Sequence, residues 1–189
     1  TGPCLPFGGE LIFIASDRRD LLPQSGGMSG QGRRHLLRNL FDGGLPDERM
    51  DLVADYKANR DSMPDDLSSQ LPLIDAYLDG AGITRIWVEG QEADDVLAAI
   101  AARARGQVDE VLIATSDKDL LQAVDDVVRV VPMSGKGPSL DPAGVLEKTG
   151  VRPDQIVPWL ALIGDSSDNI AGVPGVGKKT AARWLQTYG

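Results

Sequence analysis

Acidic residues gather at three places in this chain, each at the boundary of a predicted helix or strand. Glu92-Ala93-Asp94-Asp95 opens a predicted helix just after a strand, and Ser116-Asp117-Lys118-Asp119 follows the apolar residues 111–114. Gly164-Asp165-Ser166-Ser167-Asp168-Asn169 follows a helix that is predicted to end near Ile163. Taken singly, the groups have ordinary explanations as helix-dipole stabilisation, helix capping and a turn.

Taken together, the three groups favour a metal site. The first two lie near the carboxyl ends of predicted strands, where open α/β sheets bind ligands. Carboxylates that converge without cations repel one another, so some of them would stay protonated. Oxygen ligands suit Mg²⁺ or Mn²⁺, and two such ions can hold both the attacking and the leaving oxygen of a phosphoryl displacement. The matching chemistry is phosphodiester hydrolysis. Asp42 joins this set if residues 40–41 end a strand, and is otherwise an ordinary turn aspartate.

A short basic segment precedes the first acidic group. Lys57 and Arg60 are three residues apart and are flanked by Tyr56 and Asn59, so they could present two cations and a ring to a phosphate and a base. The alternative is a solvated helix or loop face. A metal nuclease needs cations opposite its metal ions to orient the scissile phosphate, and this segment is the natural candidate.

A glycine-rich segment, residues 172–180, lies near the end of the sequence. It is not a P-loop, because Lys179 separates the Gly177-Lys178 pair from Thr180 and no strand precedes it. It fits a helix–hairpin–helix turn, whose backbone N–H groups at a helix N-terminus can bind DNA phosphate without reading sequence. Lys178, Lys179 and Arg183 add positive charge there.

The elements that must position these residues alternate between strand and helix, which predicts a parallel sheet with right-handed crossovers. A helix is expected from about residue 64 to Gly80, because apolar residues recur there at helical spacing. The remaining expected elements are strands at 85–88, 111–114 and 127–131, helices near Glu92 and after Asp119, and helices at about 142–149, 154–163 and 178–188. Residues 1–40 receive no assignment, although Leu11-Ile12-Phe13-Ile14 could form a short strand.

Composition limits the classes of function. The 189 residues are 42% hydrophobic and 25% charged, which predicts one globular main domain with an appendage. With one cysteine, Cys4, and one histidine, His35, the chain lacks the usual zinc ligands, so any metal must be held by oxygen. A net charge of -9 argues against nucleic acid unless the carboxylates converge on bound cations. No apolar stretch is long enough for a bilayer span and no cleavage-like signal opens the chain, which predicts a soluble, cytoplasmic protein.

The order and spacing of the motifs resemble those of the 5′ nuclease family, which includes the 5′→3′ exonuclease domain of bacterial DNA polymerase I and the flap endonucleases. The motifs that carry the resemblance are Tyr56-Lys57-Ala58-Asn59-Arg60, Glu92-Ala93-Asp94-Asp95, Ser116-Asp117-Lys118-Asp119-Leu120-Leu121-Gln122, Gly164-Asp165-Ser166-Ser167-Asp168-Asn169-Ile170 and Gly172-Val173-Pro174-Gly175-Val176-Gly177. The resemblance implies a PIN-like α/β core over residues 41–150 with a mainly parallel sheet. It also implies a helical arch at about 57–80 that admits the 5′ end, and a truncated helix–hairpin–helix DNA-binding region over 151–189.

The resemblance further implies a metal-dependent 5′→3′ exonuclease and flap endonuclease of DNA replication and repair, with two Mg²⁺ or Mn²⁺ ions. Direct or water-mediated metal ligation would fall to Asp42, Glu92, Asp94, Asp95, Asp117, Asp119, Asp165 and Asp168. Catalytic roles would fall to Lys57, Arg60, Asp94 and Asp117. DNA contacts would fall to Tyr56, Lys57, Arg60, Gly175, Val176, Gly177, Lys178, Lys179 and Thr180. The expected partner is DNA with 5′ ends or flaps, bound by a monomer; fusion to a polymerase, or action beside one, stays open.

The N-terminal segment 1–40 departs from the family pattern. Family members begin with an apolar strand that ends in an aspartate metal ligand, whereas Ala15-Ser16-Asp17 follows the apolar residues here. Asp17 lies too far past the strand, and too close to Asp42, to be equated with that ligand. This leaves a second hypothesis, a branched-DNA-binding module that keeps the helix–hairpin–helix but has lost catalysis with its N-terminal ligand.

Overall fold

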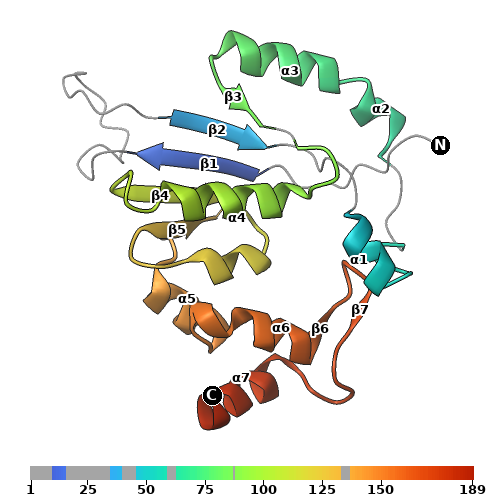
Figure 1. Ribbon diagram of the computed structural model, residues 1–189, viewed down its shortest axis with the longest axis vertical. Coiled ribbons are helices and arrows are strands. Elements are labelled where there is room, and N and C mark those ends of the chain that lie inside the picture. Colours follow the sequence, from blue (N-terminus) through green and yellow to red (C-terminus); the bar gives the residue numbers. More distant parts are fainter. Residues whose placement is uncertain (1–9, 16–34, 40–45, 59–62, 87, 133–136) are drawn as a thin grey trace.

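The computed structural model describes residues 10–15, 35–39, 46–58, 63–86, 88–132 and 137–189 (Figure 1). For the first two of these ranges it describes the backbone alone. Asp17, Asp42, Asn59 and Arg60 fall outside the described residues. The roles predicted for Asp42 and Arg60 therefore stay predictions.

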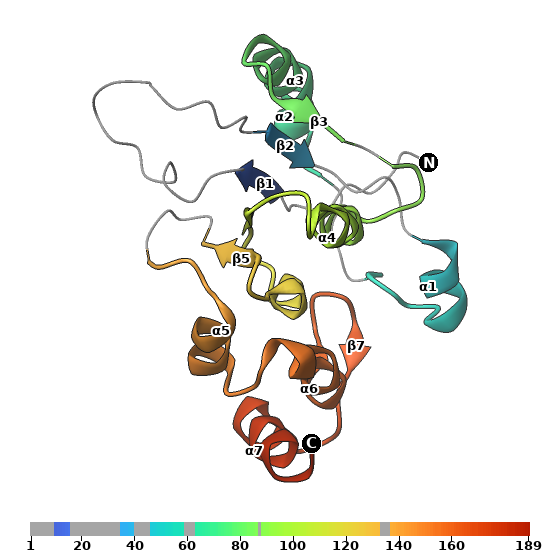
Figure 2. The ribbon, with the colours of Figure 1, turned by 60° about the vertical axis from the view of Figure 1, so that its left-hand side comes forward.

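A five-stranded sheet with the order β3-β2-β1-β4-β5 forms the centre of the fold (Figure 1; Figure 2 gives a second view). Its strands are β1 Glu10–Ala15, β2 His35–Asn39, β3 Thr84–Arg85, β4 Glu110–Ala114 and β5 Val128–Val131. β2 pairs in parallel with β3, as β4 does with β5, while β1 lies antiparallel between β2 and β4. All strands except β1 therefore run in the same direction, and the sheet is mainly parallel in this sense, as predicted.

The helix expected from about residue 64 to Gly80 is two helices, α2 Asp65–Ser68 and α3 Leu71–Gly80, so the prediction of one continuous helix is wrong. Pro72 lies in the first turn of α3. A proline clashes with the carbonyl four residues earlier, which here belongs to Ser68, the last residue of α2. The apolar spacing continues across this break, and the proline is the signal that outweighs it.

Two further helices flank the acidic residues. α1 Asp47–Leu52 is short and has no buried residue, and the sequence pattern did not predict it. α4 Ala93–Ala104 begins immediately after Glu92, as predicted, and packs across the face of the sheet (Figure 1). Burial of Leu97 and Ala101 on one side of α4 fixes its position, so the carboxylates in its first turn are held at one end of the sheet.

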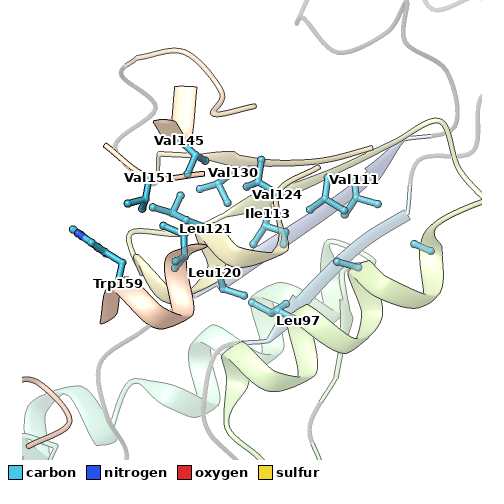
Figure 3. Packing of buried hydrophobic residues seen from close by; sticks show 14 of the residues in the cluster. Leu97, Val111, Ile113, Leu120, Leu121, Val124, Val130, Val145, Val151 and Trp159 are labelled. Atoms are coloured by element: carbon cyan, nitrogen blue, oxygen red, sulfur yellow. The ribbon is translucent and has the colours of Figure 1, made fainter. Parts of the chain in front are cut away.

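The hydrophobic core joins the sheet to the C-terminal helices (Figure 3). Buried residues from α4, β4, β5, the 3₁₀ helix η2 Asp119–Ala123 and the C-terminal region form one cluster, including Leu97, Val111, Ile113, Leu120, Leu121, Val124, Val130, Val145, Val151 and Trp159. Full burial of one such aliphatic side chain stabilises the fold by roughly 1.5–3 kcal/mol. Because Leu120 and Leu121 belong to this core, the loop between β4 and η2 that carries Asp117 is anchored at both ends.

The C-terminal region is mainly helical, as predicted, but it also contains a two-stranded hairpin that the sequence pattern did not predict. It comprises α5 Pro142–Thr149, the 3₁₀ helix η3 Pro153–Gln155, α6 Ile156–Ile163, the two-stranded hairpin of β6 Gly164–Asp165 and β7 Ile170–Ala171, and α7 Lys178–Tyr188. The Trp159 indole N–H donates to the Lys178 carbonyl at 3.1 Å and ties α6 to the start of α7. In the part of the chain that the structure describes, no helix combines the length and apolar character needed to cross a membrane.

Candidate active site

The three predicted acidic groups meet at one pocket of about 290 Å³. Asp94 and Asp95 reach it from the first turn of α4, Asp119 from η2 and Asp168 from the β6–β7 hairpin. Arg49 of α1 and Tyr56 line the same pocket. The predicted convergence of carboxylates from distant parts of the sequence is therefore present in the fold.

Asp119, Asp165 and Asp168 form a close carboxylate group among the described residues. One oxygen from each lies within 4.8 Å of the others, a spacing that permits a shared cation. Asp119 Oδ1 is buried and has no hydrogen-bond partner. A buried carboxylate oxygen without a donor is costly, so it is suited to receive a cation.

Backbone contacts fix the orientation of the Asp117 and Asp165 carboxylates. Asp117 Oδ1 accepts a hydrogen bond from the Asp119 N–H at 2.9 Å, and the Asp117 N–H donates to Thr115 Oγ1 at 2.9 Å. Asp165 Oδ1 accepts from the Ser167 N–H at 2.9 Å. These turns match the ordinary explanations of the second and third acidic groups, and they leave Asp165 Oδ2 to pair with the Lys118 ammonium.

Gly172 keeps the β6–β7 hairpin close to the end of α6. A Cβ on Gly172 would lie 2.3 Å from the Ile163 carbonyl carbon, closer than any side chain allows. Gly164 is similarly enclosed, because its Cβ would lie 2.3 Å from the Gly172 nitrogen, and it has a φ of +73°. These two glycines are therefore required for the close backbone approach that places Asp165 and Asp168.

A second carboxylate cluster centres on Glu92, whose side chain is 1% exposed. Its Oε2 lies 2.6 Å from Lys57 Nζ and 2.9 Å from Arg49 Nη1, and it accepts a hydrogen bond from the Tyr56 hydroxyl at 3.2 Å. Its Oε1 is buried without a hydrogen-bond partner. Arg49 also pairs with Asp95 at 2.7 Å and so bridges the two carboxylates.

Several carboxyl pKa values are shifted by this crowding. Burial raises the pKa of Asp94 to about 6, and the charges of Asp95 and Glu92 act in the same direction. Burial likewise raises the pKa of Asp119 to about 6, and Asp117 adds to the shift. Burial also disfavours the ionised form of Asp165, but the Lys118 ammonium and the Ser167 N–H hold the pKa of Asp165 below its ordinary value.

Tyr56 and Lys57 are buried, with exposed fractions of 5% and 9%. The Lys57 ammonium faces Glu92 and lies 3.8 Å from Asp168 Oδ1. Burial raises the pKa of the Tyr56 hydroxyl, which stays protonated and donates to Glu92. The structure thus places both residues among the carboxylates, while their predicted contact with DNA remains a prediction.

Two positively charged side chains of the site, Arg49 and Lys118, were not singled out from the sequence. Arg49 lies on the short exposed helix α1, and no local pattern around it indicates that it reaches Glu92 and Asp95. Lys118 lies within the second acidic motif, and its position between two aspartates could have indicated that it pairs with site carboxylates. Its ammonium lies 2.5 Å from Asp165 Oδ2.

The glycine-rich turn leads directly into α7. Gly175 has a φ of +78° in the left-handed region, and Gly177 immediately precedes the first helical residue, Lys178. Gly175, Gly177, Lys178 and Lys179 are exposed, whereas Val176 and Thr180 are half-buried. The turn therefore presents backbone and two lysines at the N-terminus of an 11-residue helix.

The fold and the site define an α/β protein with a carboxylate-lined pocket at one end of its sheet and a helical C-terminal region. The family model described as 5′-3′ exonuclease, N-terminal resolvase-like domain, matches residues 29–150. The model described as 5′-3′ exonuclease, C-terminal SAM fold, matches residues 151–189. The chain belongs to the 5′-3′ exonuclease family.

Curated relatives agree with this assignment. The chain is 46% identical over 150 residues to DNA polymerase I of Pseudomonas aeruginosa, a match that covers 79% of the chain and 16% of the relative. It is 43% identical over 150 residues to thermostable DNA polymerase I of Thermus aquaticus, covering 79% of the chain and 18% of the relative. It is 42% identical over 171 residues to a 5′-3′ exonuclease of Streptomyces coelicolor, covering 82% of the chain and 56% of the relative. The chain thus spans only part of the length of these relatives.

Solved structures share the fold. A T5 5′-exonuclease with bound zinc superposes with a TM-score of 0.64 at 23% identity, covering 76% of this chain and 57% of that one. A bacteriophage T5 flap endonuclease in a pseudo-enzyme–product complex with DNA and metal ions gives a TM-score of 0.64 at 22% identity, covering 77% of this chain and 57% of that one.

Proposed function

We propose that this chain is a divalent-metal-dependent 5′→3′ exonuclease and flap endonuclease that hydrolyses DNA phosphodiester bonds in replication and repair. The observation that carries the proposal is the convergence of Asp94, Asp95, Asp119 and Asp168 on one pocket from three separate parts of the chain. Family membership supports the same reading. Nothing in the described residues favours the binding-only alternative.

The donor set fits a hard divalent cation such as Mg²⁺ or Mn²⁺. Asp119, Asp165 and Asp168 offer carboxylate oxygens close enough to share one ion, and Asp119 Oδ1 is buried without a hydrogen-bond partner. Glu92 Oε1 is a second buried carboxylate oxygen that has no hydrogen-bond partner. We assign Asp42, Glu92, Asp94, Asp95 and Asp117 to the remaining ligands, direct or through water, of a two-ion site. When bound, such ions activate a water nucleophile and stabilise the leaving 3′-oxygen.

The cationic side chains have distinct tasks in this proposal. Arg49 and Lys57 offset the negative charge of buried Glu92, because each places its own charge within 3 Å of one carboxylate oxygen. Lys57 reaches a scissile phosphate only when its ammonium turns away from Glu92. Arg49 and the Tyr56 hydroxyl then remain as partners of that oxygen. Together with Arg60, Lys57 offsets charge on the transferring phosphate.

The N-terminus of α7 is the proposed grip on duplex DNA. Free N–H groups in the first turn of a helix attract phosphate, and exposed Lys178 and Lys179 add charge at the same place. Lys178→Glu/Lys179→Glu is expected to weaken binding to a branched duplex and to flatten its salt dependence. Unchanged affinity across a salt titration would place the grip elsewhere on the chain.

We further propose that the chain acts as a cytoplasmic monomer on DNA with 5′ ends or flaps, fused to or acting with a DNA polymerase. Two observations support the polymerase part of this proposal: several relatives are named DNA polymerase I, and the family is one of exonucleases.

Cleavage of a 5′-flap DNA substrate tests the function. The expected result is cutting near the junction that requires Mg²⁺ or Mn²⁺, stops with EDTA, and is lost in Asp117→Ala/Asp119→Ala. Circular dichroism of the variant separates lost chemistry from lost folding. DNA binding without cutting by the wild-type chain would favour the binding-only module, and cutting that persists in EDTA would contradict the metal-dependent reaction.

A further inference from the structure

Lys118 places a positive charge inside the carboxylate group proposed to hold a cation. Its ammonium lies 2.5 Å from Asp165 Oδ2 and 3.6 Å from Asp119 Oδ1. Both aspartates belong to the group whose oxygens lie within 4.8 Å of one another. The Lys118 ammonium therefore already contacts two of the three carboxylates that are proposed to bind the metal.

The local fold holds the backbone of Lys118 close to Asp165. Lys118 follows Asp117 in the loop after β4 and directly precedes η2, which begins at Asp119. Leu120 and Leu121 are buried in the core, so the backbone of Lys118 cannot move far from Asp165. The position of the lysine is set by the same anchor that positions Asp119.

Lys118 differs from Lys57, which also pairs with site carboxylates in the described part of the chain. The Lys57 side chain is 6% exposed, whereas the Lys118 side chain is 33% exposed. A lysine at the edge of solvent can swing its ammonium into water by rotating its flexible stem, at little cost to the core. Lys118 is thus a displaceable partner of Asp165, and Lys57 is a buried one.

We propose that Lys118 is a tethered counter-ion that competes with the divalent cation for Asp165 and weakens cation binding at the Asp119, Asp165 and Asp168 group. The inference rests on the proposed function, since the cation is the one required there. Binding must break the Lys118–Asp165 pair and also meets Coulomb repulsion from the ammonium. In return, the lysine relieves repulsion among the three carboxylates when no metal is bound.

Mn²⁺ binding to the whole chain, followed by electron paramagnetic resonance of free Mn²⁺, tests this role without reference to cleavage. Lys118→Met is expected to tighten Mn²⁺ binding on the order of tenfold, from the removal of a charge a few ångströms away in water. Lys118→Arg keeps the charge and should stay closer to wild type. Lys148→Met removes an exposed lysine near the end of α5 and should bind as wild type does. Higher KCl should narrow the difference, because salt screens the repulsion.

The outcomes separate this inference from the function beneath it. Equal or weaker Mn²⁺ binding by Lys118→Met than by wild type would overturn the counter-ion role while leaving the nuclease proposal intact. Failure of both proteins to bind Mn²⁺ would overturn the two together. Thermal melting checks that each variant is folded, and Lys118→Gln supplies a second neutral replacement.

Discussion

The backbone N–H of Lys57 donates a hydrogen bond to the Asp168 carbonyl at 3.1 Å, which joins two turns that are far apart in the sequence. Lys57 has a φ of 54°, in the left-handed region that non-glycine residues rarely adopt. Asn169, next to Asp168, has a φ of 59°, and its side-chain amide donates to the Asp55 carbonyl at 2.9 Å. Two hydrogen bonds therefore join the start of the predicted arch to the third acidic group. The residues with left-handed backbone, Lys57 and Asn169, are the donors of these two bonds.

Arg49→Ala is expected to destabilise the fold by roughly 1–3 kcal/mol, because it removes one cation from buried Glu92 while Lys57 remains. It should also reduce flap cleavage, since Glu92 and Asp95 lose the bridge between them. Urea unfolding measures the first effect. Arg103→Ala, an exposed residue in the last turn of α4, is the control. An unfolding midpoint equal to that of wild type would show that Lys57 and Tyr56 suffice to hold Glu92.

Gly172→Ala is expected to destabilise the chain by about 2 kcal/mol or more, because the new methyl group would overlap the Ile163 backbone at 2.3 Å. The hairpin must move to admit it, so Mn²⁺ binding should weaken as Asp165 and Asp168 shift. Thermal melting and a Mn²⁺ titration measure the two effects. The matched control is Gly80→Ala, because a Cβ there meets nothing within 4 Å. Similar losses in both variants would count against the close approach as the cause.

Much of this fold follows from local sequence signals. The apolar runs that became β4 and β5 are buried strands, and α7 begins and ends at its predicted residues. β2 carries no such signal, since His35, Arg38 and Asn39 interrupt its apolar residues, and it forms by pairing with β1 and β3. The antiparallel direction of β1 also depends on its neighbours.

The candidate site likewise contains residues that the sequence predicts and residues that it does not. Its carboxylates could be predicted because each lies in a short motif at an element boundary. Arg49 could not, because its partners Glu92 and Asp95 are distant in the sequence and α1 has no buried face that would indicate its position. The burial of Lys57 was equally hidden, since a lysine beside a tyrosine reads as a solvent-facing pair until the fold encloses it.

Asp125 should make stability depend on pH. Burial alone would raise the pKa of Asp125, but hydrogen bonds from the Val128 and Val127 N–H groups and from Arg105 hold it below its ordinary value. A lowered folded pKa means that the stabilisation is present above the unfolded pKa of about 3.9 and is lost as pH falls through the folded value.

Asp125→Ala should therefore cost about 1 kcal/mol at pH 7, a modest value because the ion pair with Arg105 is partly exposed. The difference from wild type should shrink as the pH is lowered toward 3, as followed by urea unfolding. Asp126→Ala, at the exposed neighbouring position, should show neither effect. A difference that stays constant with pH would assign the loss to packing instead of charge.

Divalent cations should stabilise the folded chain through the carboxylate group itself. A ligand that binds only the folded state adds about 2.7 kcal/mol at a hundred times its dissociation constant. Mn²⁺ should therefore raise the melting temperature of the wild-type chain, and EDTA should reverse the rise. In Asp165→Ala/Asp168→Ala the rise should be much smaller, because the shared site loses two of its three close oxygens.

The rise in melting temperature on adding Mn²⁺ is the quantity to compare among variants, since removing repelling charges can itself change the melting temperature without metal. Asp65→Ala/Asp66→Ala, two exposed aspartates at the start of α2, controls for a general effect of lost negative charge. An equal Mn²⁺ increment in all three proteins would place the stabilising cation outside the hairpin carboxylates.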